Sequence, residues 1–451
     1  MQQFDSVVIG SGQGGNPLAQ ALGSRGERVA LIERSYLGGT CINTGCTPTK
    51  MYVASAQVAH YARNASRWGV RAGHLEMDMS AVIERKNGYV GQSRRYWDKR
   101  FKENSHVTVL RGSARFTGQR TLDVDGQQLT GARVFIDTGT RTAIPPIEGI
   151  TTGPFLTNQS ILELAEVPSH LVVLGAGYIG LEFGQIFRRF GSRVTIVGRG
   201  GQILANEDED IATTLQKALE AEGVEFRLNA NTTAVTYGND SVTLAMERGG
   251  EITGSHLLLA TGRTPNTPDL DLAQTGVQVD DKGYVRVNDR LETTAENVWA
   301  LGDVKGGPAF THISYNDYQI VYGNLFENKT LRVSDRIVPY CVFTDPQLGR
   351  VGMTEREARK AGKRIKIGSV EMSHVARAIE RSETAGLMKI VVDAENDQVL
   401  GAAILSVEGG ETVQILSTLM LARQPYTLLR GAIYIHPTLA EGFFGLMDSV
   451  Q

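Results

Sequence analysis

The first hydrophobic positions of the chain follow a pattern that returns later. Residues 4–9 form a short apolar run that ends at Gly10, a helix-like segment follows, and a second apolar run ends at Glu33. This order predicts a strand, a glycine-rich turn, a helix and a second strand. Residues 170–199 show the same order again. Two copies of one phosphate-binding unit predict two dinucleotide sites in an α/β chain.

The rest of the chain predicts three further regions. Residues 51–100 are expected to be largely helical, and residues 106–147 to form short strands joined by turns. Residues 336–451 show a different pattern, in which alternating strands precede helices. Because 451 residues exceed what one hydrophobic core usually supports, we expect several domains, packed together without a low-complexity linker. We place domain boundaries near residues 146, 270 and 336.

Composition and charge argue against several classes of function. Charged residues are 21% of the chain and the formal net charge is −3, so no basic surface indicates nucleic-acid binding. The chain has no stretch of about 18 uncharged apolar residues, so no membrane span is predicted. The N-terminus lacks the basic and apolar regions of a signal peptide. We therefore expect a cytoplasmic protein with no nucleic-acid or membrane partner.

Two of the three cysteines lie close together. Cys41 and Cys46 follow the first dinucleotide unit, in a segment expected to become helical at Pro48. The first turn of a helix can bring two Cα atoms within the roughly 7 Å that a disulfide needs, and a helix N-terminus lowers the pKa of a thiol. A zinc half-site and two structural thiols are the alternatives, but no further Cys or His lies near at ligand spacing. The pair is therefore expected to be redox-active, with no resident metal. Cys341 is expected to be a buried core thiol.

The first glycine-rich turn runs from Gly10 to Gly15 and includes Gly12. Glycine lets the turn tighten and lets backbone N–H groups approach a pyrophosphate at the start of a helix. Glu33 stands about 20 positions on, where an acidic side chain can hydrogen-bond a ribose hydroxyl. A purely structural turn is the alternative, but the flanking strand and helix favour a dinucleotide site.

The second glycine-rich turn runs from Gly175 to Gly180. At the end of its second strand, where NAD-specific units carry an acidic residue, the chain has Gly198 and Arg199. A guanidinium group can bind a 2′-phosphate, so this position favours NADPH over NADH. The alternative is that Arg199 is a solvated surface residue, in which case NADH remains possible.

The segment 38–50, GGTCINTGCTPTK, resembles the active-site signature of the pyridine nucleotide-disulfide oxidoreductases. This family includes glutathione reductase, dihydrolipoyl dehydrogenase and mercuric reductase. The similarity extends along the whole chain, and further motifs follow in the family's order: Thr138-Gly139, residues 260–266, Leu301-Gly302-Asp303, and His436-Pro437-Thr438 with Glu441.

The resemblance implies an α/β fold with two Rossmann-type domains and a C-terminal α+β interface domain. Residues 1–145 and 271–335 would form the FAD-binding domain, residues 146–270 the NAD(P)H-binding domain, and residues 336–451 the dimerisation domain. The chain would then act as a homodimer whose two subunits share each active site.

The resemblance also implies the roles of individual residues. Cys46 would lie beside the flavin and Cys41 would attack the substrate. Lys50 and Glu182 would form an ion pair near the flavin N5. His436, oriented by Glu441 and supplied by the other subunit, would move protons to and from the thiols, a task that suits an imidazole.

The implied cofactor sites contain residues from many parts of the chain. The FAD site would comprise Gly10, Gly12, Gly15, Glu33, Gly39, Thr40, Lys50, Ala114, Thr138, Gly139, Asp303 and Thr311. The NAD(P)H site would comprise Gly175, Gly177, Tyr178, Ile179, Gly180, Glu182, Arg199 and Gly262, with Tyr178 covering the nicotinamide pocket until the coenzyme enters.

The chain departs from several members of the family. Gln20 and Ala21 stand where glutathione reductases carry adjacent arginines, which weighs against glutathione as substrate. No cysteine follows Cys341, so the C-terminal thiol pairs of mercuric reductases and high-molecular-weight thioredoxin reductases are absent. The wording of the motifs is most similar to a mercuric reductase-like group without these cysteines.

We therefore expect an oxidoreductase that passes electrons from NAD(P)H through FAD and the Cys41–Cys46 disulfide to a small-molecule disulfide or another thiol-reactive acceptor. One alternative is the reduction of mercury or copper ions, or of a hypothiocyanite-type oxidant, by the same dithiol. Another is a structural flavoprotein subunit without catalytic activity.

Overall fold

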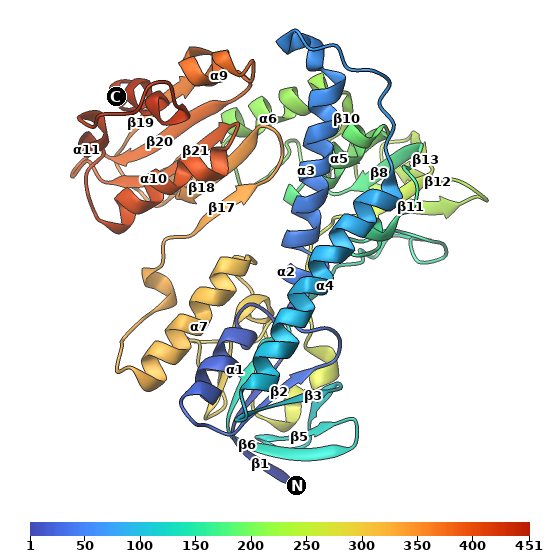
Figure 1. Cartoon of the computed structure of the whole chain (residues 1–451), viewed down its shortest axis with the longest axis vertical. Helices are drawn as coiled ribbons and strands as arrows, with labels where there is room; N and C mark the ends of the chain where they lie inside the picture. The colour runs from blue at the N-terminus through green and yellow to red at the C-terminus, as the bar shows by residue number, and fades with distance from the viewer. The chain divides into compact units, whose positions relative to one another are not determined.

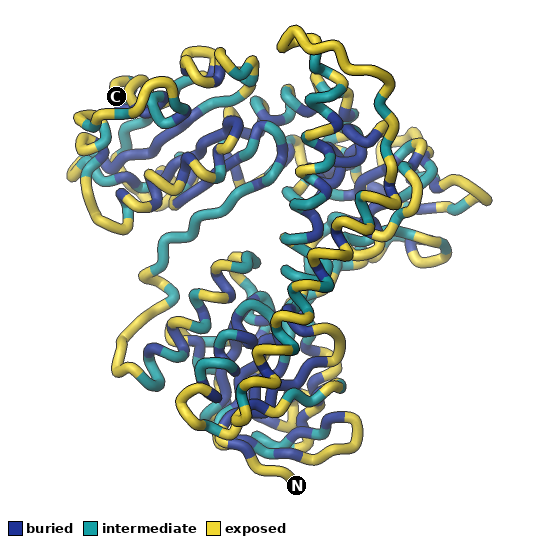
Figure 2. The backbone as a smooth tube through the Cα atoms, viewed as in Figure 1, coloured by how far each residue is buried: buried dark blue, intermediate teal, exposed yellow.

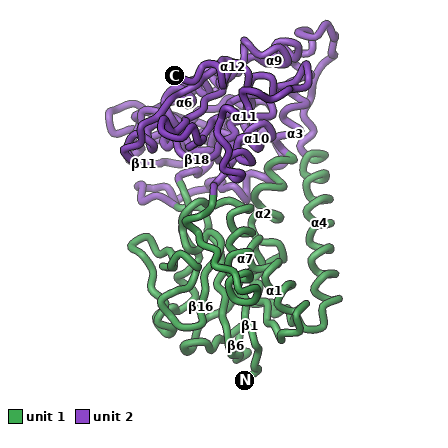
Figure 3. The backbone as a smooth tube through the Cα atoms, turned by 90° about the vertical axis from the view of Figure 1, so that its left-hand side faces the viewer, with its two compact units in different colours: residues 1–51, 80–143, 262–336 green, residues 52–79, 144–261, 337–451 purple.

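The computed structural model describes all residues from Met1 to Gln451, in two compact units (Figure 3). Unit 1 consists of residues 1–51, 80–143 and 262–336, and unit 2 of residues 52–79, 144–261 and 337–451. Three of the divisions, after residues 143, 261 and 336, lie beside the boundaries expected near 146, 270 and 336. The assignment of three separate domains stays a prediction.

Unit 1 is built on a seven-stranded sheet. Its strand order is β3-β2-β1-β6-β5-β4, and β16 also pairs with β6. The pairs that join β3, β2, β1, β6 and β16 are parallel, whereas β4 and β5 extend the sheet in antiparallel pairs. The strands of unit 1, including the separate pair β7 and β15, are β1 (Gln2–Ile9), β2 (Val29–Glu33), β3 (Val107–Arg111), β4 (Ala114–Phe116), β5 (Thr121–Val124), β6 (Gln127–Ile136), β7 (Thr140–Thr142), β15 (Arg263–Pro265) and β16 (Val298–Ala300).

The central strands of this sheet are buried on both faces, as Figure 2 shows by their dark blue colour. Successive side chains of a strand point to opposite faces, so neighbours in sequence enter different clusters. Val7 packs in one cluster with Phe116, and Val8 packs in another with Leu18. A parallel strand covered on both sides therefore has a continuous apolar run, which is the pattern of residues 4–9.

Helices cover the sheet of unit 1, and α1 and α7 lie side by side on it (Figure 1). The helix that carries Cys46 begins at Cys46, so the prediction of a start at Pro48 is wrong by two residues. Proline is tolerated throughout the first helical turn, where its missing N–H would have no partner. The helices are α1 (Gly15–Ser24), α2 (Gly39–Asn43), α4 (Met79–Glu103) and α7 (Thr311–Phe326), with α3 (Cys46–Arg63) continuing from unit 1 into unit 2.

Unit 2 contains the second dinucleotide unit. A four-stranded parallel sheet has the order β10-β9-β8-β14, and a three-stranded antiparallel sheet has the order β11-β12-β13. The elements are β8 (His170–Leu174), α5 (Tyr178–Phe190), β9 (Arg193–Val197), α6 (Glu209–Ala221), β10 (Val224–Arg227), β11 (Thr232–Tyr237), β12 (Val242–Met246), β13 (Glu251–Gly254) and β14 (His256–Leu259). The predicted repeat of strand, turn, helix and strand is confirmed.

The C-terminal segment of unit 2, residues 337–451, contains a five-stranded antiparallel sheet with the order β17-β18-β21-β20-β19. Helix α10 lies against β18 and β21 (Figure 1). The elements are β17 (Pro339–Val342), β18 (Gln347–Gly352), α8 (Glu355–Lys360), β19 (Ile365–Glu371), α9 (Ala376–Glu380), β20 (Leu387–Asp393), β21 (Val399–Ser406), α10 (Gly409–Leu421), α11 (Thr427–Arg430) and α12 (Gly442–Asp448). None of the chain's helices has the length and apolar character needed to cross a bilayer.

Candidate active site

The close cysteine pair lies where two helices meet in unit 1. Cys41 belongs to the short helix α2 and is half-buried, and Cys46 is the exposed first residue of α3. All three cysteines are free thiols. The Cys46 Sγ lies 3.1 Å from the Oγ1 of Thr311, the first residue of α7. Unit 1 therefore brings together two of the residues predicted to surround the flavin.

The Cys41 thiol has its pKa raised, chiefly by a hydrogen bond with the Cys46 side chain and then by burial. Cys41 therefore holds its proton more tightly than an isolated thiol does. That the Cys46 thiol is kept ionised at the start of a helix stays a prediction.

The first glycine-rich turn joins β1 to α1. Gly10 has a φ of +101°, and a Cβ there would lie 2.2 Å from the carbonyl oxygen of Asp137. A Cβ at Gly15 would lie 2.1 Å from the carbonyl oxygen of Gly10. Any other residue at either position would collide with backbone, so the strand, the turn and the helix can approach this closely only through glycine.

Glu33, at the end of β2, already serves this turn. Its Oε2 accepts hydrogen bonds from the N–H and the Oγ of Ser11, at 3.0 and 2.5 Å, and its Oε1 accepts the N–H of Ser35 at 2.8 Å. The side chain is buried. The carboxylate therefore fixes the turn from one side, in the position where dinucleotide units place an acidic residue.

The second turn repeats this geometry in unit 2. Gly175 has a φ of +122°, and a Cβ there would lie 2.3 Å from the carbonyl oxygen of Ala260. A Cβ at Gly180 would lie 2.1 Å from the carbonyl oxygen of Gly175. The residues predicted for the NAD(P)H site thus begin α5 or stand just before it: Gly175, Gly177, Tyr178, Ile179, Gly180 and Glu182.

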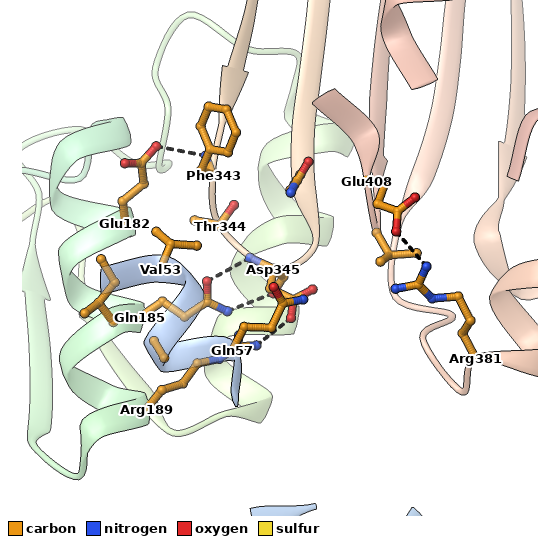
Figure 4. Close-up of a pocket in the computed structure, with 14 residues that line it drawn as sticks. Val53, Gln57, Glu182, Gln185, Arg189, Phe343, Thr344, Asp345, Arg381 and Glu408 are labelled. Atoms are coloured by element: carbon orange, nitrogen blue, oxygen red, sulfur yellow. Dashed lines mark hydrogen bonds and ion pairs between the residues drawn. The ribbon is translucent and has the colours of Figure 1, made fainter. Parts of the chain in front are cut away.

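Two predicted residues of this second site differ in their environment. Arg199 is exposed just after β9, and no acidic residue stands beside it in sequence. Glu182 is buried in α5, and its Oε1 accepts the N–H of Phe343 at 2.8 Å (Figure 4). Arg199 can therefore contact a solvated ligand group, whereas the Glu182 carboxylate is held in a fixed position.

The loops that follow β6 and β16 hold further predicted FAD residues in unit 1. The Asp303 carboxylate lies 2.7 Å from the Arg263 guanidinium and accepts a hydrogen bond from the Oγ1 of Thr140 at 3.2 Å. Thr138 donates from its Oγ1 to the backbone oxygen of Asn266 at 3.0 Å. Of the other predicted FAD residues, Gly39 and Thr40 lie in α2, Lys50 in α3, Ala114 at the start of β4 and Gly139 at positive φ. Gly262, predicted for the NAD(P)H site, also has a positive φ.

His436 and Glu441 form a hydrogen-bonded pair in unit 2. The His436 Nδ1 lies 2.9 and 3.1 Å from the two carboxylate oxygens of Glu441. The pKa of Glu441 is lowered by the backbone N–H of Thr438 and then by His436. The imidazole side chain is 72% exposed, so its Nε2 edge is open to solvent. A fixed, exposed imidazole is suited to proton transfer with a bound molecule.

Two groups that sequence reasoning missed lie at these sites. Asp137 is buried beside the first glycine-rich turn, and Gln185 in α5 pairs with the backbone of Asp345. Their signals are weak in the sequence. Asp137 could have been found by aligning the two repeats, since IDTG follows β6's apolar run where LATG follows that of β14.

The third cysteine lies apart from the close pair, in unit 2. Cys341 is half-buried in β17 and its Sγ contacts the carbonyl oxygen of Val342 at 3.5 Å, so the prediction of a buried thiol is wrong. The strand lies at the edge of its sheet, which leaves one side less covered. No group of three or more His, Cys, Asp or Glu side chains could hold a metal ion.

Comparison with known proteins gives two family matches. Residues 4–317 match the model of the pyridine nucleotide-disulphide oxidoreductases, and residues 338–445 match the dimerisation domain of the same family.

Individual relatives are similar over nearly the whole chain. The probable pyridine nucleotide-disulfide oxidoreductase RclA of Escherichia coli strain K12 is 38% identical, with 100% of both chains covered. A dihydrolipoyl dehydrogenase of Thermus scotoductus is 34% identical over 100% of this chain and 97% of the relative. A mercuric reductase of Bacillus cereus is 31% identical over 97% of this chain and 70% of the relative.

A solved structure has the same fold. The HOCl-induced flavoprotein disulfide reductase RclA from Escherichia coli superimposes with a TM-score of 0.91 at 38% identity, covering 99% of this chain and 100% of that one. A Cu(II) complex of the same flavoprotein gives a TM-score of 0.91 at 37% identity, covering 99% of both chains.

Proposed function

Because the chain belongs to the family of FAD-dependent pyridine nucleotide-disulphide oxidoreductases, we propose that it reduces a small-molecule disulfide or another thiol-reactive acceptor with NADPH, through the Cys41–Cys46 pair. The balance is one NADPH, one proton and one disulfide to one NADP⁺ and two thiols. Bound FAD would supply the two-electron relay between coenzyme and cysteines. The observation that carries the proposal is the pair itself, in which the Cys41 thiol hydrogen-bonds with the Cys46 side chain and has its pKa raised.

The raised pKa of Cys41 supports separate roles for the two thiols, because it favours a proton on that sulfur. We propose that the Cys46 sulfur carries the negative charge of the reduced pair. Cys46 also contacts Thr311, a proposed FAD residue. We therefore assign Cys46 to the flavin and Cys41 to the acceptor, with Lys50 and Glu182 as the charged pair near the flavin N5.

Unit 1 has the features that an FAD site needs. The Gly10–Gly15 turn brings the end of β1 to the start of α1, whose N-terminus can bind a pyrophosphate. Glu33 stands at the end of the adjacent strand β2, where a ribose would lie. We propose residues 1–145 and 271–335 as the FAD-binding domain and residues 146–270 as the coenzyme domain, with Asp303 on the ribityl chain.

The coenzyme is proposed to be NADPH rather than NADH. The exposed Arg199 follows β9, at the position beside which the adenine ribose of a bound dinucleotide would lie. A guanidinium group there can form charge-assisted hydrogen bonds with a 2′-phosphate, whereas Gly198 offers no carboxylate to a 2′-hydroxyl.

The enzyme is proposed to act as a homodimer with shared active sites. The match to the dimerisation domain covers the segment that holds His436 and Glu441. Ile433 and Ile435, which precede His436, are 100% and 79% exposed. Contiguous exposed apolar surface marks an interaction site, so these two side chains support a partner at this segment. The partner's imidazole would then exchange protons with Cys41. We expect the protein in the cytoplasm.

A second candidate acceptor is a metal ion or a chlorine-derived oxidant. Relatives include a mercuric reductase, of which this chain covers 70%, and an HOCl-induced flavoprotein disulfide reductase whose structure was solved with Cu(II). Because no further cysteine pair follows Cys341 to take electrons onward, Cys41 and Cys46 would be the thiols that reduce such acceptors.

The experiment that tests the proposal is steady-state turnover with NADPH and NADH against a panel of acceptors. The panel contains glutathione disulfide, lipoamide, other low-molecular-weight disulfides, hypothiocyanite, Hg(II) and Cu(II). The proposal expects turnover of one or more acceptors that is lost in the Cys41→Ser variant. Turnover that survives this substitution would contradict it.

A further inference from the structure

A buried carboxyl group joins two of the turns assigned to the FAD site. Asp137 is the first residue after β6, and its Oδ2 accepts the N–H of Gly15, the first residue of α1, at 2.6 Å. Its own N–H donates to the carbonyl oxygen of Ile9 at 2.8 Å. A Cβ at Gly12 would lie 2.8 Å from Oδ2, and one at Gly302 would lie 2.4 Å from Oδ1. The carboxyl group therefore fills the space between the glycine-rich turn and the loop that holds Asp303.

The second dinucleotide turn shows that this carboxyl group is not needed to build such a turn. A Cβ at Gly175 would lie 2.3 Å from the carbonyl oxygen of Ala260, just as one at Gly10 would lie 2.2 Å from that of Asp137. Ala260 is thus the counterpart of Asp137 in the repeat. Nothing lies within 4 Å of a Cβ at Gly177, the counterpart of the glycine that meets the carboxyl group. The carboxyl group is an addition to the first turn alone.

The surroundings of Asp137 contain no cation that pairs with it. Its ionisable neighbours are the carboxyl groups of Asp303, Asp317 and Glu33. These have their own partners, which are Arg263 for Asp303, Arg336 and Lys305 for Asp317, and Ser11 and Ser35 for Glu33. Burial raises the pKa of Asp137 well above its usual range, the Gly15 N–H opposes this, and the three neighbouring carboxyl groups add to it.

A bound pyrophosphate would increase the cost of an ionised Asp137. The pyrophosphate of a dinucleotide carries two negative charges and binds at the N-terminus of a helix such as α1. The Asp137 carboxyl group already accepts the first N–H of that helix, so an ionised form would compete with the pyrophosphate for the same positive end. A neutral acid can keep the hydrogen bond from Gly15 without this repulsion.

We propose that Asp137 makes FAD binding proton-dependent, because the cofactor binds to the form of the protein in which this carboxyl group is neutral. Where Asp137 is ionised in the apoprotein, binding takes up one proton from solvent, and release of FAD returns it. Affinity is then highest and constant at low pH and falls as the pH rises. The inference rests on the proposed assignment of the 10–15 turn to FAD.

The test compares FAD affinity of the full-length apoprotein and of Asp137→Asn between pH 6 and pH 10, measured by quenching of flavin fluorescence. The asparagine oxygen can still accept the Gly15 N–H but carries no charge. The wild-type Kd is expected to rise up to about tenfold per pH unit above the pKa of the apoprotein. The variant's Kd is expected to stay constant and to lie below that of the wild type at high pH. Asp393→Asn, a buried acid of β20, is the matched control and should follow the wild type.

Two further measurements keep the test independent of one variant. Asp137→Ala copies the second turn and should also remove the pH dependence, and it is used if the asparagine variant does not fold. Proton uptake by wild-type apoprotein, followed with an indicator dye in weak buffer, should reach a substantial fraction of one proton per FAD in the pH range where Kd rises, and about zero at pH 6.

The outcomes separate this inference from the function on which it rests. Equal pH dependence in wild type and variants, or no proton uptake at any pH, would overturn the role of Asp137. Wild-type apoprotein that binds no FAD at pH 6 would instead contradict the proposed FAD site.

Discussion

The Nδ1 of His436 lies 2.9 Å from the Oε1 of Glu441, so the carboxylate fixes one edge of an imidazole whose other edge is exposed. The Glu441 pKa is lowered by the Thr438 N–H and by His436, so this carboxylate stays ionised at all pH values near neutrality. The imidazole is thereby held with its Nε2 directed away from its carboxylate partner.

Replacing Glu441 by Gln is expected to slow acceptor reduction while leaving flavin reduction by NADPH unchanged. The amide cannot stabilise the protonated imidazole as a carboxylate does, and a positioned acid–base group contributes about 10²-fold or more to rate. We expect turnover to fall by up to about 10²-fold. Stopped-flow measurements separate the two half-reactions. Glu411→Gln, at an exposed carboxylate in α10, is the control. Equal slowing of both half-reactions would contradict the role.

Replacing Gln185 by Glu is expected to weaken unit 2 and to slow flavin reduction. The Gln185 amide accepts the N–H of Asp345 and donates to its carbonyl oxygen, both at 2.8 Å (Figure 4). A carboxylate cannot donate to that oxygen, so we expect a loss of about 1–3 kcal/mol in the free energy of unfolding. The same segment donates the Phe343 N–H to Glu182, so the position of that carboxylate should change too.

The control for this substitution lies in a pocket of unit 2 that Glu182, Gln185 and Phe343 line (Figure 4). Gln57 also lines it, but its amide donates to the Tyr61 hydroxyl at 3.1 Å and not to the 343–345 segment. Gln57→Glu should therefore leave the rate of flavin reduction near that of the wild type. Chemical denaturation gives the stability of both variants, and a Gln185→Glu variant with unchanged stability would show that the paired hydrogen bonds contribute little.

Replacing Arg199 by Ala is expected to lower the preference for NADPH over NADH. Hydrogen bonds to charged groups contribute about 1.5–3 kcal/mol, so kcat/KM for NADPH should fall about 10- to 100-fold while that for NADH changes little. Arg193→Ala is the matched control, because Arg193, the first residue of the strand β9 that precedes Arg199, pairs with Glu225 at 3.0 Å. An unchanged ratio of the two kcat/KM values in Arg199→Ala would show that Arg199 does not bind the 2′-phosphate.

Replacing both Ile433 and Ile435 by Ser is expected to weaken the dimer. Burying an isoleucine side chain contributes about 1.5–3 kcal/mol, so two of them should raise the dimer dissociation constant by a factor of about 10² or more. Sedimentation velocity over a range of concentrations measures this. Ile144→Ser, at another exposed isoleucine, should not alter it. A double variant that dissociates no more than the wild type would place the dimer surface elsewhere.

Much of the fold could be predicted because its determinants are local. The turns at Gly10 and Gly175 need glycine for positive φ and for close approach of backbone, and this requirement is visible as a motif. The parallel strands before them are buried on both faces and have continuous apolar runs. The family and the α/β fold expected from these motifs are confirmed, as is dependence on FAD and a pyridine nucleotide.

The features that sequence reasoning missed depend on contacts between distant residues. Asp137 lies 122 positions from Gly15, and Gln185 lies 160 positions from Asp345. Spacing along one helix or strand indicates neither contact. The raised pKa of Cys41 could not be predicted for a related reason, since its hydrogen bond with Cys46 depends on how α2 and α3 meet.

The most direct test of the central claim is anaerobic titration of the purified holoenzyme with NADPH, followed by absorbance at long wavelength. A thiolate beside oxidised flavin gives a charge-transfer band, so the wild type and Cys341→Ser should show it after reduction by two electrons. Cys41→Ser, which leaves the Cys46 thiolate, should show it without NADPH. Cys46→Ser should show no such band at any point of the titration. A Cys46→Ser variant that keeps the band would contradict the assignment of Cys46 to the flavin.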